Sequence, residues 1–127
     1  MATYADGLSV KVELTEFTSQ EIRSLGVLID QRIVQESPFD TGVFKNNWLM
    51  SIGSPSTEIL EDGDISGSKA IERARQVVMD YPLNSLPDLW LVNNLPYAAR
   101  LNNGWSQQQD NPKWVEREIA QAVAYGR

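Results

Sequence analysis

The residues of this sequence whose types and spacing could support chemistry are carboxylates. Glu61, Asp62 and Asp64 lie almost side by side in the chain. Grouped acids either bind a divalent cation or serve as general acid and base in hydrolysis. The order Glu-Asp-Gly-Asp lacks the ligand spacing of a calcium loop. Because acids in a segment rich in Gly and Ser are usually solvated, we interpret these three as surface residues, with a weak contact to a divalent ion as the alternative.

Asp40-Thr41-Gly42 is the second group to consider, because aspartic proteases carry the same tripeptide. Those enzymes need two carboxylates that share a proton. The chain holds one copy, so a homodimer would have to supply the second. The structural alternative is an Asx-type turn in which Gly42 takes a positive φ on entry to a strand. We favour the turn, because a predicted helix and Pro38 precede the tripeptide in place of an apolar strand.

The amino-acid composition leaves little other catalytic machinery. The chain of 127 residues has no cysteine and no histidine. It therefore has no disulfide, no thiolate metal site and no cysteine nucleophile, and it lacks the commonest general base and zinc ligand. Its glycines stand singly, without a phosphate-binding loop before a helix, and the sequence has no nucleophile elbow. We expect a protein that is not an enzyme and that holds no metal or cofactor.

The net charge is −6 and is uneven along the chain. Residues 1–63 hold ten acidic and four basic side chains, whereas residues 64–127 hold seven of each. Tight nucleic-acid binding draws on many cations, so this balance argues against it. No apolar run reaches the roughly 18 residues of a membrane span, and the first residues lack the basic and apolar order of a signal peptide. We expect no membrane segment, and a protein made and used without export.

The hydrophobic pattern predicts a single domain over residues 1–127 with three strands. Alternating apolar residues predict strands at 8–14 and 43–52. A short, almost wholly apolar run at 89–92 is typical of a buried central strand. The sheet should be small and mostly antiparallel.

Three helices should cover this sheet and give an α+β fold. The first is predicted from about Ser19 to Glu36, because Thr18 and Glu21 have capping-box spacing before an apolar stripe. A middle helix should follow Ser68 as its cap. A C-terminal helix should follow an Asp-Asn cap, with Pro112 at its first position.

Two loops stand out between these elements. Residues 53–67 form a connection of some fifteen residues, longer than the usual roughly 4–6, and are therefore either mobile or functional; residues 57–60 within it could pair briefly as a strand. Further on, Tyr97 to Asn103 predicts one or two helical turns closed by Gly104 in a left-handed cap. Trp105 then enters a polar loop, where a large aromatic often anchors a protein contact.

Two segments together resemble a known family. Residues 38–48 read Pro-Phe-Asp-Thr-Gly-Val-Phe-Lys-Asn-Asn-Trp. This resembles a Pro-x-Asp-Thr-Gly-x-Leu-Arg-like signature that follows the first helix in small neck and tail-completion proteins of tailed bacteriophages. Residues 92–104 are similar to the second signature, in which a strand ending in Asn leads to Tyr-Ala-x-x-Leu-Glu-x-Gly and a loop rich in Ser and Gln. Asn102 stands where that family, which is similar to the lambda minor tail protein Z group, often has Glu.

The resemblance implies an α+β fold and a non-enzymatic role in the virion, at the head–tail junction, after assembly in the host cytoplasm. It implies a ring that contacts the tail terminator and the head connector or stopper, while DNA passes nearby without being bound tightly. The residues expected to shape the motif turns are Asp40, Thr41, Gly42, Asn93, Tyr97 and Gly104. The residues expected at interfaces are Trp105, Gln107, Gln108, Glu61, Asp62 and Asp64.

Two rival functions remain from the residues alone. A small acidic inhibitor that mimics DNA would carry carboxylates at phosphate-like spacing on one face, whereas the acids here cluster in a loop and along one helix. A homodimeric acid hydrolase would use Asp40. Both rivals predict a partner or an activity that differs from those of a virion component.

Overall fold

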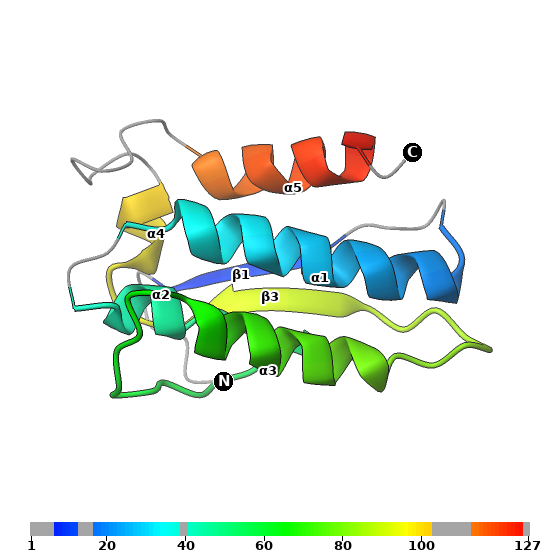
Figure 1. The fold of residues 1–127 in the computed structure, drawn as a ribbon, viewed down its shortest axis with the longest axis horizontal. Helices are drawn as coiled ribbons and strands as arrows, with labels where there is room; N and C mark the ends of the chain where they lie inside the picture. The colour runs from blue at the N-terminus through cyan, green and yellow to red at the C-terminus, as the bar shows by residue number, and fades with distance from the viewer. Residues whose placement is uncertain (1–6, 13–16, 39–40, 103–112, 126–127) are drawn as a thin grey trace.

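The computed structural model describes residues 7–12, 17–38, 41–102 and 113–125. Within them, three strands and five helices form one α+β domain, which confirms the predicted fold class (Figure 1). The strands are β1 (Leu8–Val12), β2 (Leu49–Ile52) and β3 (Leu89–Asn93). The helices are α1 (Ser19–Glu36), α2 (Val43–Asn46), α3 (Ser68–Met79), α4 (Ala98–Asn102) and α5 (Trp114–Tyr125).

The sheet has the order β1-β3-β2, and both strand pairs are antiparallel, as predicted. Leu91 at the centre of β3 pairs with Val10 on one side and with Met50 on the other. Because side chains alternate along a strand, these three residues share one face of the sheet. Leu91 is fully buried on that face, which the helices cover.

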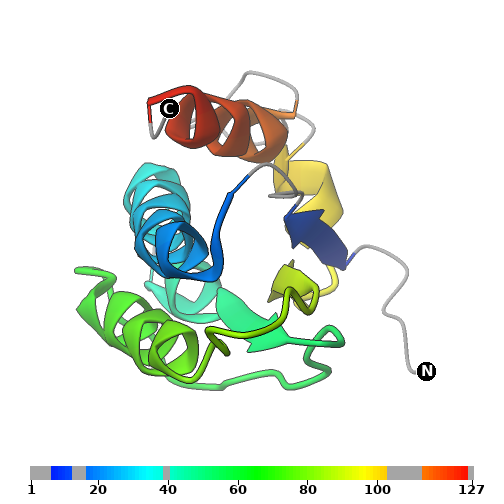
Figure 2. The ribbon, with the colours of Figure 1, turned by 90° about the vertical axis from the view of Figure 1, so that its right-hand side faces the viewer.

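The three long helices lie side by side, with α1 between α3 and α5 (Figures 1 and 2). Helix α3 lies next to β2, and α5 lies on the β1 side of the sheet. Ile29 and Ile33 of α1 have no exposed surface, and each contributes about 1.5–3 kcal/mol by burial. The indole ring of Trp114, at the start of α5, meets Trp48 edge to face at 6.4 Å between centroids.

Helix α1 begins with the predicted capping box. The Thr18 amide donates to Glu21 Oε1 at 2.9 Å, and the Glu21 amide donates to Thr18 Oγ1 at 3.2 Å. Hydrogen bonding from the Thr18 backbone amide, and then from the Thr18 side chain, lowers the pKa of the exposed Glu21 carboxyl. At the other end, Ser37 leaves helical geometry before Pro38, and its hydroxyl accepts a hydrogen bond from Trp48 Nε1.

The predicted strand over residues 43–52 is wrong in its first half. Residues 43–46 form the short helix α2, and the strand begins only at Leu49. Phe44 and Trp48 suggested a strand because both lie on one parity, but a spacing of four also fits a helical turn. Their rings pack edge to face at 5.6 Å, and the Asn46 amide closes the turn onto the Gly42 carbonyl at 2.9 Å.

The last helix begins at Trp114 and is capped from a distance. The Asn102 side chain accepts from the Val115 amide at 2.9 Å and donates to Glu116 Oε1 at 2.7 Å. Asn102 thereby performs an N-cap's role from the end of α4. The predicted Asp-Asn cap and Pro112 lie outside the described residues.

Gly26 allows α1 to approach α3 closely, and its replacement tests that contact. A Cβ atom there would lie 2.8 Å from Val78 Cγ1 and 3.4 Å from Leu89 Cδ2. Gly26→Ala should gain about 1 kcal/mol of helix propensity but lose roughly 1–3 kcal/mol through overpacking against the stiff Val78 side chain. We expect a lower midpoint of urea unfolding.

The matched control places Gly26→Ala in a Val78→Ala background. There the added methyl group has space, so the same substitution should be neutral or stabilising. A Gly26→Ala protein that is more stable than the parent, with Val78 intact, would contradict this packing.

Candidate functional site

The turn at Thr41 and Gly42 packs directly against the acidic loop. Gly42 has φ of +82°, and its carbonyl accepts the Asp64 amide at 3.0 Å. A Cβ atom on Gly42 would lie 2.4 Å from the Ile65 nitrogen. One on Gly63 would lie 2.2 Å from the Thr41 oxygen. Two segments that are more than 20 residues apart in the sequence therefore meet backbone to backbone.

Asparagine side chains hold the rest of this loop. Asn47 donates to the Leu60 carbonyl at 2.9 Å and accepts the Leu60 amide at 2.8 Å. Asn46 donates to the Asp62 carbonyl at 3.0 Å, and Asn94 bonds two further carbonyls, of Ser56 and Glu58. The predicted strand at 57–60 does not form, because a side-chain amide takes the place of a neighbouring strand.

The three acids of the loop differ in their surroundings. Glu61 and Asp62 are exposed. Asp64 is half-buried, and its Oδ2 accepts the Lys69 amide at 2.9 Å, with Ser66 Oγ on Oδ1 at 2.7 Å. These bonds, the Lys69 amide first, lower the Asp64 pKa.

Asp64 therefore supplies the side chain that caps α3. The predicted Ser68 cap is wrong, since Ser68 is the first helical residue and Gly67 holds the cap position without a side-chain bond. Over the described part of the chain, no three acidic side chains gather into a group that could hold a metal ion.

Asn93 joins the two segments on which the family resemblance depends. It has no exposed surface, donates to the Phe44 carbonyl at 3.0 Å and accepts the Leu95 amide at 3.3 Å. The Phe44 ring lies 6.1 Å from that of Tyr97, which is 37% exposed. Partial burial raises the pKa of the Tyr97 hydroxyl.

These contacts bring the turn, the loop and the second motif to one end of the molecule, beside α2 and α4 (Figure 1). We call this region, which comprises residues 41–47, 56–67 and 93–97, the α2 end. Of the predicted site residues, it holds Thr41, Gly42, Glu61, Asp62, Asp64, Asn93 and Tyr97. The others, Asp40, Gly104, Trp105, Gln107 and Gln108, lie outside the described residues.

Sequence reasoning named Asn93 but missed the other residues that assemble the α2 end. These are Asn46, Asn47 and Asn94, together with Arg73 of α3. Arg73 Nη1 donates to Asn46 Oδ1 at 3.0 Å, and Nη2 donates to the Asn46 carbonyl. Two Asn-Asn pairs, each next to an apolar run, were the available signal, because buried asparagines need several hydrogen-bond partners.

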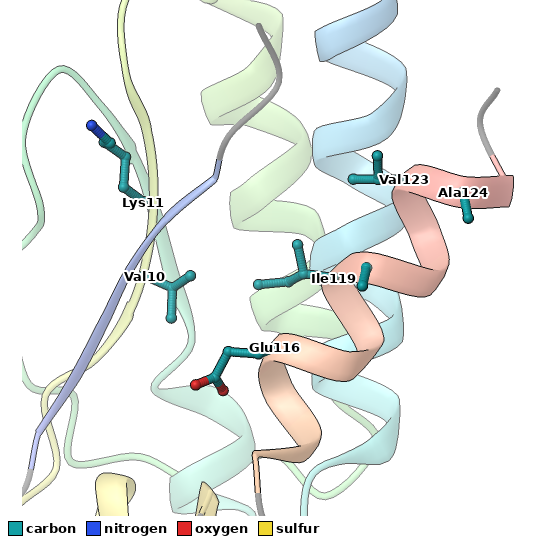
Figure 3. Close-up of a pocket in the computed structure, with 7 residues that line it drawn as sticks. Val10, Lys11, Glu116, Ile119, Val123 and Ala124 are labelled. Carbon is teal, nitrogen blue, oxygen red and sulfur yellow. The ribbon is translucent and has the colours of Figure 1, made fainter. Parts of the chain in front are cut away.

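A separate apolar groove of about 540 Å³ lies between the edge strand β1 and α5 (Figure 3). Val10 and Ile119 point toward one another across it, whereas Lys11 points away. Glu116 lies at one end, where Asn102 orients its carboxylate. A single acid among aliphatic side chains offers a surface for contact and little for chemistry.

Exposed apolar side chains occur at both ends of the molecule. Ile65 and Tyr97 lie at the α2 end, with 54% and 37% of their surface exposed. Met79 ends α3, and Leu83 and Leu86 follow in the next connection, at the opposite end of the molecule (Figure 1). Each of the three is more than half exposed. Clustered exposed apolar residues often mark protein contacts.

Comparison of the chain with models of protein families, with curated proteins and with solved structures finds no match. In the described ranges, no helix is both long and apolar enough to cross a membrane.

Two glycines with positive φ provide a matched test of the turn. Gly53 has φ of +91°, and a Cβ atom added there would meet no atom within 4 Å, whereas Gly42 is crowded by backbone. Gly53→Ala should cost about 1–2 kcal/mol, from its conformation alone. Gly42→Ala should cost roughly 1–3 kcal/mol more, from the clash, and Gly42→Val more again. Equal losses for the two alanine variants in urea unfolding would contradict the contact with residues 64–65.

Neighbouring asparagines test the link between the two motifs. Asn93→Ala leaves the buried Leu95 amide without a partner, and an unsatisfied buried group costs about 1–3 kcal/mol. It also removes one of two donors from the Phe44 carbonyl, which keeps the Asn47 amide at 3.1 Å. Asn94→Ala releases carbonyls of the partly exposed loop, which water can reach, and should cost less. Thermal unfolding of both variants measures the difference. The link would be refuted by an Asn93→Ala protein as stable as Asn94→Ala.

Proposed function

We propose that this protein is a structural component of a tailed-phage virion that acts at the head–tail junction. It joins the tail to the head connector through protein–protein contacts. The observation that carries the proposal is the meeting of the two family-like segments at the α2 end, through the bond from Asn93 to the Phe44 carbonyl and the contact of Phe44 with Tyr97. Segments that serve a common surface are expected to meet in this way.

The two exposed apolar groups support a joining role. A protein between two neighbours needs contact surface on opposite sides. Tyr97 and Ile65 supply it at the α2 end, and Met79, Leu83 and Leu86 supply it at the other. Aromatic side chains that are half-exposed often become anchors of an interface.

The charge distribution supports passage of DNA without tight binding. Glu58, Glu61 and Asp62 are exposed on the acidic loop, and the chain carries a net charge of −6. If this loop borders a channel in a ring of copies, its field repels phosphates. Retention of the protein on a DNA column at physiological salt would count against this arrangement.

Native mass spectrometry tests the proposal. The protein is measured alone and mixed with the tail-terminating and head-connector proteins of the same genome. We expect a ring-sized species in at least one condition, and its mass gives the stoichiometry. A monomer in every mixture would contradict the proposal and favour the acidic inhibitor. A stable dimer with hydrolytic activity that Asp40→Asn abolishes would favour the enzyme.

Matched charge reversals locate the contact. Glu61→Lys changes the α2 end, whereas Glu72→Lys makes the same charge change at an exposed position of α3 outside both apolar groups. The first variant should reduce the mixed complex, and the second should leave it intact. Equal effects of the two variants would show that net charge, and not this surface, governs assembly.

A further inference from the structure

Asp30 is a buried carboxyl group that lacks hydrogen-bond partners. It lies in the middle of α1, has no exposed surface, and neither of its oxygens is hydrogen-bonded. An unpaired buried carboxylate is costly, so such a group takes up a proton or attracts a cation. Burial accordingly raises the Asp30 pKa well above its ordinary value, although the nearby Arg73 opposes this shift.

Arg73 is the cation that acts on Asp30, and it is occupied elsewhere. Two of its nitrogens bond Asn46, at the side-chain and backbone oxygens. Its Nε is buried without a partner, like the two Asp30 oxygens. One donor on α3, Arg73 Nε, and two acceptors on α1, the Asp30 carboxyl oxygens, are therefore buried without hydrogen-bond partners.

Two further charged side chains lie near α1. From α2, Lys45 lies against Gly67 together with Val34, one turn further along α1. From α5, Glu118 pairs with Arg32 at 3.1 Å. Arg73 is the cation whose charge opposes the rise in the Asp30 pKa, and the carboxylates of Asp64 and Glu58 act on Arg73 as well.

Asn46 connects this pair to the acidic loop. While Arg73 holds the Asn46 oxygens, the Asn46 nitrogen donates to the Asp62 carbonyl at 3.0 Å. A guanidinium that moved toward Asp30 would leave Asn46 without its support. The loop would then lose one of the side-chain bonds that fix it.

We propose that Asp30, Arg73 and Asn46 form a proton-controlled latch on the acidic loop. With the proton on Asp30, Arg73 stays on Asn46 and the loop is held. When the proton leaves to solvent, the carboxylate draws Arg73 away, Asn46 is released and the loop around Asp62 loosens. Its role in partner binding rests on the proposed function, whereas the latch itself is a property of the isolated chain.

The sign of the pH dependence follows from the raised pKa. The folded protein binds the Asp30 proton more tightly than the unfolded chain does. Stability and loop order are therefore greatest below the ordinary aspartate pKa and decline as pH rises toward the raised value. Asp30→Asn keeps the neutral form at every pH and should remove this decline.

Hydrogen exchange of backbone amides tests the latch in the whole protein. The reporters are the amides of Leu60 and Asp64, which bond Asn47 and Gly42, with the amides of β3 as the reference for global unfolding. After correction for the intrinsic effect of pH, loop protection in the wild-type chain should fall about tenfold for each pH unit between the ordinary and the raised aspartate pKa, while it stays below the protection of β3. In Asp30→Asn it should stay constant.

Two results would overturn the latch. One is a wild-type loop whose protection does not change with pH. The other is a loop whose protection equals that of β3 at every pH, because the loop would then open only when the whole domain unfolds.

Arg73→Met provides a second variant that does not depend on the fold tolerating Asp30→Asn. It should show a weakly protected loop at every pH, and pH-dependent protection in it would also refute the latch. A negative result leaves the head–tail assignment intact, because the experiment contains no partner protein.

Discussion

The carbonyl of Gly42 is the group on which the α2 end depends. It accepts two amides, one from Asn46, which closes α2, and one from Asp64, which draws in the acidic loop. Only glycine allows this arrangement, because the residue at position 42 has a positive φ and the backbone of residues 64–65 lies where a Cβ atom would be. Asp64, placed by this contact, then caps α3. The positions of α2, the acidic loop and the start of α3 thus all depend on Gly42.

Asparagine side chains hold the rest of the α2 end in place. In place of sheet pairing, the loop uses asparagine amides, which can donate and accept at once. Asn47 satisfies both backbone groups of Leu60, and Asn93 ties the end of β3 to α2. A surface built on such bonds is ordered by few contacts and responds to the loss of any one of them. That property is consistent with the proposed contact between the α2 end and neighbouring proteins.

Patterns local to one element were predictable from the sequence. The capping box and bounds of α1 and the strands β1 and β3 follow from periodicity and cap residues. The strand predicted over 43–52 was wrong in its first half, because the spacing of Phe44 and Trp48, four residues apart, fits a helix as well as a strand. The prediction of the α3 cap failed because the capping side chain, Asp64, is brought to the helix by the contact of its backbone with Gly42.

The candidate site was only partly predictable for the same reason. Both motif segments were evident as strings of residues, but their meeting depends on Asn93, Phe44 and Arg73, which act over long separations. The unpaired burial of Asp30 also has no local signature, since a single acid on a helix usually faces solvent. Long-range hydrogen bonds and burial are properties of the folded chain.

The central claim is that the protein occupies the head–tail junction of a virion, with the α2 end as a contact surface. Electron cryomicroscopy of intact particles, produced from the genome that encodes this chain, tests it most directly. The account predicts density for several copies of this fold around the neck, with Tyr97 and the acidic loop against an adjacent ring. Mature particles that lack the chain, or that carry it with the α2 end facing solvent, would contradict the account.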